Sequence, residues 1–197
     1  MEMKEILRYC DDGNIPYEFC GRLDVDKIKT TDTFPGVLAI VSQPDVMIDD
    51  LLDGTPIICL DGVKDPGNLG TMLRTCDWFG VDAILLGKNC VELFNPKVVR
   101  ASMGAIFHLQ IFSEVNLETE LQQLQAKEFQ VLSASVQAKQ SLLQISFPKK
   151  TVVLFGSEAH GISPALEKLS EELFSIPRFG KAESLNVTAA CAAVLAV

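Results

Sequence analysis

Apolar runs and amphipathic stretches follow one another along most of the chain, and the pattern becomes regular near residue 54. From Thr55 onward, short apolar runs rich in β-branched residues are separated by stretches with helical spacing, which predicts strands that alternate with helices. This alternation is typical of a mostly parallel sheet covered by helices. The pattern therefore predicts an α/β fold for residues 54–197, and periodicity alone predicts nothing more specific.

The predicted strands are short and apolar, and most of them lead into a helix. Six strands are expected, at Pro56–Leu60, Ala83–Leu86, Ile106–Ile111, Gln130–Ala134, Thr151–Phe155 and Leu173–Ile176. Five helices are expected, at Leu69–Phe79, Asn95–Ser102, Leu117–Lys127, Pro164–Leu169 and Asn186–Val197. Gly80 stands where a glycine would end the first of these helices.

Residues 1–53 show a weaker pattern. Two helices are expected, at Met3–Cys10 and Asp24–Lys29, with short strands at Tyr17–Cys20 and Val37–Val41. Turns are expected at Asp11–Asn14 and Gln43–Asp45, before an acidic linker at Met47–Asp53. This block has few apolar residues and is below the size that usually folds without help, so we do not expect it to hold a core alone.

Composition narrows the classes of function. A chain of 197 residues with 48% apolar residues allows one full α/β domain plus a fragment, with a normal buried core. No apolar run approaches the roughly 18 residues that span a bilayer, and the N-terminus lacks a signal-peptide core. The six cysteines fall singly, without C-x-x-C spacing, which favours reduced thiols of a cytoplasmic protein over a zinc or disulfide role.

The net charge of −9 argues against strong nonspecific binding of nucleic acid. The acidic excess is concentrated in residues 1–53, with twelve acidic and five basic residues, whereas residues 54–197 carry fourteen and twelve. Several bases lie inside or beside the motifs described next, namely Lys64, Arg74, Lys97, Arg100, Arg178 and Lys181. A local basic face on an acidic body is therefore expected.

The segment 65–70 is a turn that feeds the first helix of the α/β region, and the free N–H groups of such a helix start attract anions. Arg74 lies one turn further along, so its side chain can reach the same opening. Its planar guanidinium donates several hydrogen bonds at once, which suits a phosphate. The alternative is an ordinary capped amphipathic helix with one solvated arginine.

Two further segments have the character of ligand loops. Gly156 to Glu158 follows a buried strand, where α/β sheets place ligands, and a glycine there lets a ligand approach the backbone. Ser184 to Val187 places small polar side chains before an alanine-rich helix. The alternatives are a simple strand-ending turn for the first segment and an N-capped core helix for the second.

In this order, the three segments resemble the SpoU family of RNA ribose 2′-O-methyltransferases, within the SPOUT superfamily. The matching motifs are N-x-G-x-x-x-R at Asn68, Gly70 and Arg74, G-S-E-x-x-G at 156–161, and I-P-x followed by E-S-L-N-V at 176–187. The resemblance spans roughly residues 54–197 and implies a SpoU catalytic domain there. It further implies a C-terminal deep trefoil knot, a rare exception among folds, in which the chain after Thr151 passes through a loop of earlier strands. A homodimer through the knot region is implied as well.

Residues 1–53 resemble the tail of the ribosomal-protein-like, α+β substrate-recognition domain that many SpoU enzymes carry in front of the catalytic domain. The first half of such a domain would be missing, and the uncapped last helix would end with the chain itself.

The resemblance also implies the site residues. S-adenosylmethionine would be held largely by main-chain groups, with contacts from Leu154, Gly156, Ile176, Leu185, Asn186 and Ala189. The catalytic residues would be Asn68, Arg74, Glu158, Ser184 and Asn186, with Arg74 and Arg100 on the RNA and no metal. Family proposals give Arg74 the activating role. Because an arginine is nearly always protonated, we expect it to grip a phosphate and stabilise the developing alkoxide rather than act as a base.

Two other functions are compatible with the fold that these motifs imply. One is a non-catalytic RNA- or cofactor-binding protein, against which the intact motif residues argue. The other is a SPOUT enzyme that methylates a base, whereas the N-x-G-x-x-x-R and S-L-N-V signatures favour ribose. Ribosomal and transfer RNA are both candidates for the substrate. His108 and His160 have no partner at a telling spacing and are expected to be structural or solvent-facing.

Overall fold

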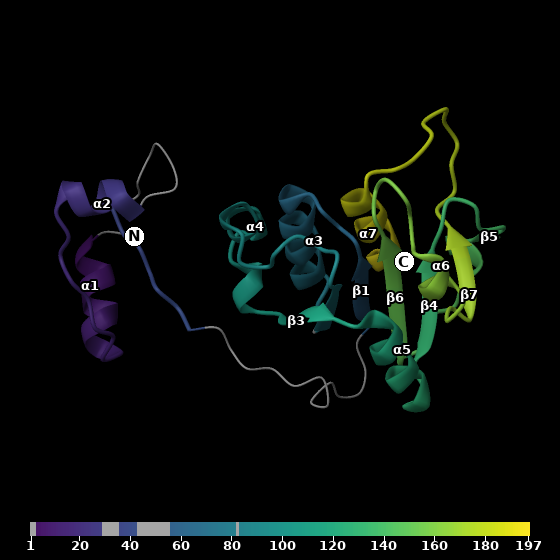
Figure 1. The fold of residues 1–197 in the computed structure, drawn as a ribbon, viewed down its shortest axis with the longest axis horizontal. Coiled ribbons are helices and arrows are strands. Elements are labelled where there is room, and N and C mark those ends of the chain that lie inside the picture. The colour runs from purple at the N-terminus through teal and green to yellow at the C-terminus, as the bar shows by residue number, and fades with distance from the viewer. Residues whose placement is uncertain (1–2, 29–35, 43–55, 82) are drawn as a thin grey trace. The chain divides into compact units, whose positions relative to one another are not determined.

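The chain divides into two units, Met1–Gln43 and Pro44–Val197 (Figure 1). The computed structural model describes residues 3–28, 36–42, 56–81 and 83–197. The predicted turn at Gln43–Asp45 and the predicted linker at Met47–Asp53 lie outside the described residues.

The N-terminal unit contains two helices, α1 at Met3–Asp12 and α2 at Arg22–Ile28. Both predicted helices are thereby confirmed, with shifted ends. The strands predicted at 17–20 and 37–41 are wrong, because both segments are irregular. A strand needs a hydrogen-bonded neighbour, and none of this unit's described residues forms one.

The C-terminal unit is built on one seven-stranded sheet of order β3-β2-β1-β6-β4-β7-β5. The strands are β1 Ile57–Asp61, β2 Ala83–Gly87, β3 Gln110–Val115, β4 Gln130–Ala134, β5 Gln140–Ser141, β6 Thr151–Gly156 and β7 Glu172–Ser175. Every pair of neighbours is parallel, which confirms the predicted sheet. Parallel strands all end at the same edge, so the loops after β1, β6 and β7 share one edge of the sheet.

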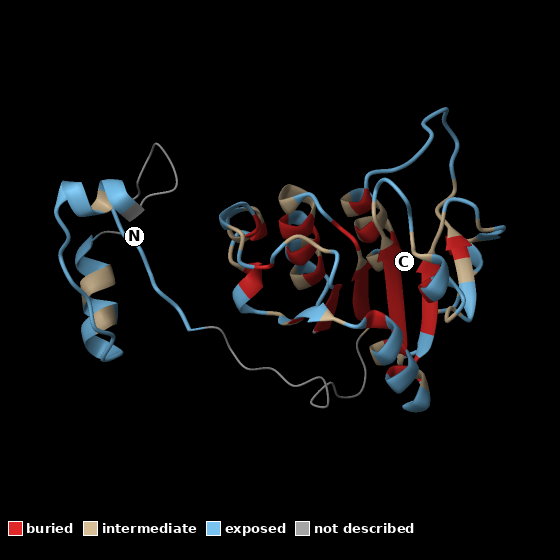
Figure 2. Cartoon of the chain, in the orientation of Figure 1, coloured by how far each residue is buried: buried red, intermediate tan, exposed pale blue. Residues whose placement is uncertain are grey.

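Helices cover both faces of this sheet, so the unit has three layers. They are α3 Pro66–Trp78, α4 Pro96–Ser102, α5 Leu117–Ala126, α6 Pro164–Glu167 and α7 Val187–Leu195, with short 3-10 turns η2 Ala105–Phe107 and η3 Leu142–Gln144. One core cluster joins the sheet to α3, α4 and α7, and a second joins it to α5 and α6. Figure 2 shows the central strands as the buried middle of the unit.

Alternate residues along each strand supply the two cores. In β1, Ile58 and Leu60 face the α3 and α7 layer, whereas Ile57 and Cys59 face the α5 and α6 layer. This is the two-residue period of a strand buried on both faces, which explains why these strands read as continuous apolar runs.

The strand predicted at Ile106–Ile111 is wrong in its first half. Ala105–Phe107 forms a 3-10 turn, in which Phe107 N–H donates to the Gly104 carbonyl and His108 N–H to the Ala105 carbonyl. Ile106 is buried in the α3 core by this turn, not by strand pairing, so its apolar character misled the prediction. The strand itself begins at Gln110.

The remaining helix ends agree closely with the pattern. Gly80 has a left-handed φ of +70° directly after α3, as predicted. The last helix ends at Leu195 instead of Val197. Among the residues that the structure describes, no helix is both long and apolar enough to cross a membrane.

Candidate active site

The loops after β1, β6 and β7 bring the three motifs to the carboxyl edge of the sheet (Figure 1). β1 and β6 are neighbours, with Asp61 opposite Gly156 in the register, so their loops leave the sheet side by side. The β7 loop runs from Ile176 to Asn186, where α7 begins. A ligand at this edge would therefore meet all three motifs, as in other open α/β sheets.

Asn68 joins residues from all three motifs in one hydrogen-bond chain. Its Nδ2 donates to Oε1 of Glu158, at 2.5 Å, and its Oδ1 accepts from Nδ2 of Asn186, at 3.3 Å. The structure thus brings together three of the five residues predicted to be catalytic.

The direction of this chain is set by α7. Asn186 is the N-cap of α7, and its Oδ1 accepts from the backbone N–H of Thr188 at 2.8 Å. Its Nδ2 is therefore the group that faces Asn68, which leaves the Asn68 Nδ2 to donate to Glu158. An aspartate at position 68 could not make this chain, because it has no donor for Glu158.

The start of α3 is held in a similar way. Asp65 is its N-cap, and its Oδ1 accepts a hydrogen bond from the Asn68 N–H at 2.8 Å. Pro66 is the first residue of the helix. Asp65 was not among the predicted site residues. An N-cap aspartate followed by proline is a known helix-start signal, so the sequence could have revealed it.

Gly156 is required by the protein's own backbone. A Cβ at this position would lie 2.0 Å from the Gly161 carbonyl carbon and 2.2 Å from the Ile162 nitrogen. The loop doubles back here, since Ser157 and Gly161 exchange two backbone hydrogen bonds of 3.0 and 2.9 Å. From the sequence, Gly156 was expected only to let a ligand approach the backbone. Its first role in the structure is to let this loop close, and Glu158 is exposed on the loop.

A second residue outside the predicted site also shapes this loop. Asp61, the last residue of β1, accepts a 2.8 Å hydrogen bond from the backbone N–H of Ser163 through Oδ2. This bond ties the far end of the Glu158 loop to the neighbouring strand. Nothing in the spacing of the motifs pointed to Asp61.

Gly70 of the first motif is a packing residue. A Cβ there would lie 2.5 Å from the Ala101 Cβ and 2.7 Å from the Val98 carbonyl oxygen, so α4 contacts the α3 backbone directly. The close contact fixes α3, and with it Asn68 and Arg74, against its neighbour.

Arg74 and Arg100 are both exposed. Within the described parts of the chain, neither guanidinium has a hydrogen bond or an ion pair. An arginine without an internal partner can bind a phosphate without first breaking an internal contact. Arg74 lies on α3, one turn beyond the Gly70 contact.

The residues predicted to hold the cofactor fall into two groups. Leu185, Asn186 and Ala189 are exposed, and Gly156 and Ile176 are half-buried. Ser184, predicted to be catalytic, is exposed as well. Leu154 is instead fully buried in the core under α5 and α6, between β1 and β4. Its side chain supports the loop from below and does not face the edge.

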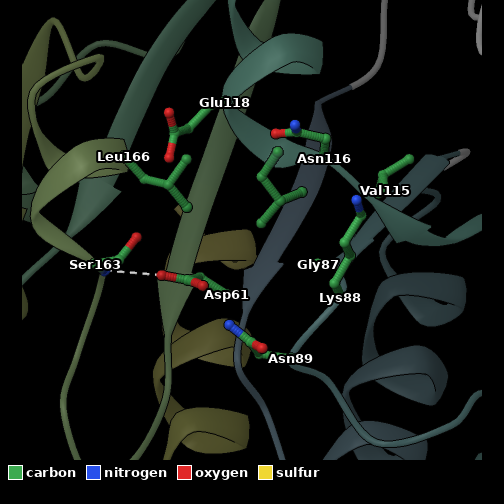
Figure 3. Close-up of a pocket in the computed structure, with 10 residues that line it drawn as sticks. Asp61, Gly87, Lys88, Asn89, Val115, Asn116, Glu118, Ser163 and Leu166 are labelled. Atoms are coloured by element: carbon green, nitrogen blue, oxygen red, sulfur yellow. Dashed lines mark hydrogen bonds between the residues drawn. The ribbon is translucent and has the colours of Figure 1, made fainter.

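A separate cavity of about 220 Å³ opens on the α5 and α6 side of the same edge (Figure 3). It is lined by the last residues of β1, β2 and β3, by the start of α5, and by Ser163 and Leu166. None of the predicted site residues lines it. The hydrogen-bonded cluster and this cavity therefore lie in different places at the carboxyl edge.

The cysteines and histidines lie outside the cluster. All six cysteines are free thiols, and burial raises the pKa of Cys59 well above its usual value. A hydrogen bond with Cys191, together with burial, does the same for the pKa of Cys76. His108 Nδ1 lies 3.0 Å from Asp77 Oδ2, and His160 is exposed. No group of three or more His, Cys, Asp or Glu in the described ranges could hold a metal ion.

Comparison with known proteins shows which family the chain belongs to. Residues 55–196 match the sequence profile of the SpoU rRNA Methylase family. The chain belongs to this family. The SpoU profile begins at the start of the sheet and ends with α7, so it covers every predicted site residue.

Individual relatives and solved structures of SpoU and TrmH proteins are also similar to this chain. The chain is 31% identical over 198 residues to the 23S rRNA (guanosine(2553)-2′-O)-methyltransferase RlmP of Bacillus subtilis, covering 96% of this chain and 78% of the relative. A TrmH-family protein from Porphyromonas gingivalis superposes with a TM-score of 0.78 at 33% identity, covering 91% of this chain and 72% of that one. An AdoMet-bound rRNA methyltransferase from Sinorhizobium meliloti gives 0.67 at 32% identity, covering 73% and 55%.

Proposed function

We propose that this protein transfers a methyl group from S-adenosylmethionine to a ribose 2′-hydroxyl of RNA. The observation that carries the proposal is the hydrogen-bond chain Glu158–Asn68–Asn186. Arg74 lies on the same helix as Asn68 and has no hydrogen bond or ion pair with any described residue. Membership of the SpoU family and the named 2′-O-methyltransferase relatives support the reaction type. The relatives named for 23S rRNA favour ribosomal over transfer RNA.

The cofactor would lie against the loops at 156, 176–178 and 184–189. The main-chain N–H and C=O groups of Ile176 and Leu185 make no hydrogen bond with any other described residue, so they are available to an adenine and a methionine group. Gly156, Asn186 and Ala189 complete this set, and Leu154 supports it from the core. S-adenosylmethionine supplies an electrophilic methyl on its sulfonium. An AdoMet-bound relative of the same fold supports the choice of cofactor.

The residues of this chain then act on the ribose. Arg74 grips a phosphate beside the target and stabilises the negative charge that develops on the 2′-oxygen as it attacks. A guanidinium is nearly always protonated, so this role fits it better than that of a base. Asn68 and Asn186 hold the loop that carries Glu158. Ser184 precedes Asn186 by two residues, before the start of α7. Alignment of this kind can contribute about 7–11 kcal/mol to lowering a barrier.

Residues 1–53 would serve as a partial substrate-recognition region, and residues 54–197 as the catalytic domain. The division of contacts between residues 43 and 44 supports a boundary in this part of the chain. Arg100, exposed on α4, would add an RNA contact outside the cofactor loops. A cytoplasmic location agrees with this RNA-directed role.

The C-terminal segment 151–197 would form the deep trefoil knot of the SPOUT fold, and the protein would act as a homodimer through it. Insertion of β6 between β1 and β4 and the packing of α7 against α3 support this arrangement. An alanine-rich α7 offers a surface suited to close packing. Sedimentation at tens of micromolar is expected to show a dimer, and a monomer there would contradict this part of the proposal.

The reaction is tested by incubating the full chain with methyl-labelled S-adenosylmethionine and RNA from cells that lack the modification. Digestion to nucleosides should place the label in a 2′-O-methylnucleoside. Label on a base would instead indicate a base methyltransferase. Cofactor and RNA binding without any transfer would indicate a non-catalytic binding protein.

A further inference from the structure

The loop between β7 and α7 carries an aromatic side chain that packs against none of the residues that the structure describes. Phe179 is 96% exposed, more than any other large apolar side chain that the structure describes. Its neighbours Arg178, Gly180 and Lys181 are exposed as well. In Figure 2 this loop is a continuous exposed segment that stands out from the C-terminal unit. Neither the core nor the predicted cofactor contacts account for this ring.

The loop keeps its shape without using the phenylalanine. Arg178 donates through Nη1 to the backbone carbonyl of Ala182, at 3.2 Å, and so closes the neck of the loop. Phe179 lies within the closed turn, where a polar residue would be the usual choice. Because an exposed phenyl ring loses hydrophobic stabilisation and makes no contact here, its presence points to a ligand outside the fold.

The place of the loop indicates which ligand. It leaves the carboxyl edge after β7 and leads directly into Ser184 and Asn186, so it borders the Asn68 cluster. Two bases, Arg178 and Lys181, flank the ring, against one acid, Glu183. An aromatic face with basic neighbours is the combination that binds single-stranded nucleic acid, because every base has a face that can stack.

We propose that Phe179 stacks on an unpaired nucleobase next to the ribose that is methylated, with Lys181 on the adjoining phosphate. The inference rests on the proposed function, because it takes RNA as the substrate. Paired bases are stacked inside a duplex and cannot accept the ring, so the site selects a single-stranded loop or bulge.

Fluorescence gives a test that does not depend on catalysis. Trp78 is the chain's single tryptophan and is 85% exposed at the far end of α3. The double substitution Trp78→Phe with Phe179→Trp puts the only indole on the loop, and the unchanged protein is the matched control. Single-stranded poly(U) should quench the loop indole strongly and Trp78 little, and a poly(A)·poly(U) duplex should quench neither. Equal quenching of both indoles, or by both RNAs, would overturn the proposal.

Kinetics give the second arm. Phe179→Ala should raise the KM for the RNA about tenfold, with the affinity for S-adenosylmethionine unchanged. Phe179→Tyr should restore the KM, and Phe179→Leu should not, because leucine is apolar but cannot stack. A KM within twofold of normal for Phe179→Ala, or full rescue by leucine, would refute stacking. So would a change in sedimentation, which would show that the ring packs on a second copy of the chain.

The two arms separate this inference from the proposed function. If the unchanged protein methylates ribose and the loop indole is not quenched, only the role of Phe179 fails. If no methyl is transferred, the proposed function fails, and quenching by poly(U) alone then decides whether the loop binds single-stranded RNA.

Discussion

The N-terminal and C-terminal units differ most in what they bury. No side chain in residues 3–27 or 36–42 is buried, although this part includes Ile15, Tyr17 and Phe19. The C-terminal unit buries Phe155 and Phe174 almost completely in the core beside α3 and α7, and it has a second core on the other face of its sheet. Apolar residues alone therefore do not make a core. They must recur on elements that can face one another.

The same difference bears on where the proposed active site lies. The Asn68 cluster, Arg74 and the three loops proposed to hold the cofactor all lie in the C-terminal unit, where α3, β6 and α7 contribute residues to its core. Preorganised chemistry needs such support, because the reacting groups must be held closely in place. In residues 3–27 and 36–42 of the N-terminal unit no buried side chain supplies comparable support.

The largest expected difference is in stability. Phe174→Ala removes a fully buried ring and should lower the free energy of unfolding by about 3–5 kcal/mol. Phe19→Ala removes a ring that is 79% exposed and should change it by less than about 0.5 kcal/mol. Urea unfolding followed by circular dichroism measures both. Similar losses for the two variants would show that the N-terminal unit has a core of its own.

The next difference is in catalysis, and two exposed arginines provide the comparison. Arg74→Ala should lower kcat about 100- to 1000-fold with unchanged affinity for S-adenosylmethionine, because a charge-stabilising donor is lost. Arg74→Lys should recover little, since a point charge cannot replace the planar fork. Arg8 forms a 3.8 Å ion pair with Asp12 on α1, and Arg8→Ala should leave kcat within about threefold. Near-normal turnover by Arg74→Ala would remove this residue from the mechanism.

A smaller effect is expected from the cluster itself. Asn68→Asp removes the donor to Glu158 and sets two carboxylates together, so kcat should fall about tenfold. Asn14→Asp, on an exposed turn of the N-terminal unit, is the matched change and should have no effect on kcat. If both variants turn over normally, the hydrogen-bond chain has no role in catalysis.

The smallest effect concerns pH and the buried thiols of the C-terminal unit. The pKa of Cys59 is raised by burial, so above about pH 8.5 the unfolded thiol loses its proton while the folded one keeps it. The free energy of unfolding therefore keeps this contribution below that pH and falls as the pH rises above it, by at most about 1.4 kcal/mol per pH unit for one thiol. Melting temperatures between pH 7.5 and 9.5 should fall less steeply for Cys59→Ala. An identical slope would contradict the linkage.

Sequence periodicity predicted the sheet well, because strands buried on both faces leave long apolar runs such as Val152 to Phe155. It missed β5, whose two residues Gln140 and Ser141 carry no apolar signal and are held only by pairing with β7. It misread Ile106, which is buried by a 3-10 turn. The strand predicted at 17–20 in the N-terminal unit was wrong because a pattern of apolar and polar residues cannot supply the neighbouring strand that pairing requires.

The motifs pointed to residues that the fold brings together, but not to the contacts that require some of them. Asn68, Glu158 and Asn186 meet as one chain, which no spacing along the sequence could show. Gly156 was expected to let a ligand approach, and Gly70 was given no role beyond the motif. The contacts that require these glycines are made by the loop at 161–162 and by α4. Such close approaches depend on the tertiary fold, so they are invisible in a single sequence.

Hydrogen–deuterium exchange of the full chain, with and without S-adenosylmethionine, tests most directly whether the cofactor site lies at the carboxyl edge of the C-terminal unit. The cofactor should slow exchange of the backbone amides in segments 154–158, 176–178 and 184–189. Exchange in residues 3–27 and 36–42 should stay the same. Unchanged exchange in the three loops at saturating cofactor, or protection confined to the N-terminal unit, would contradict the account.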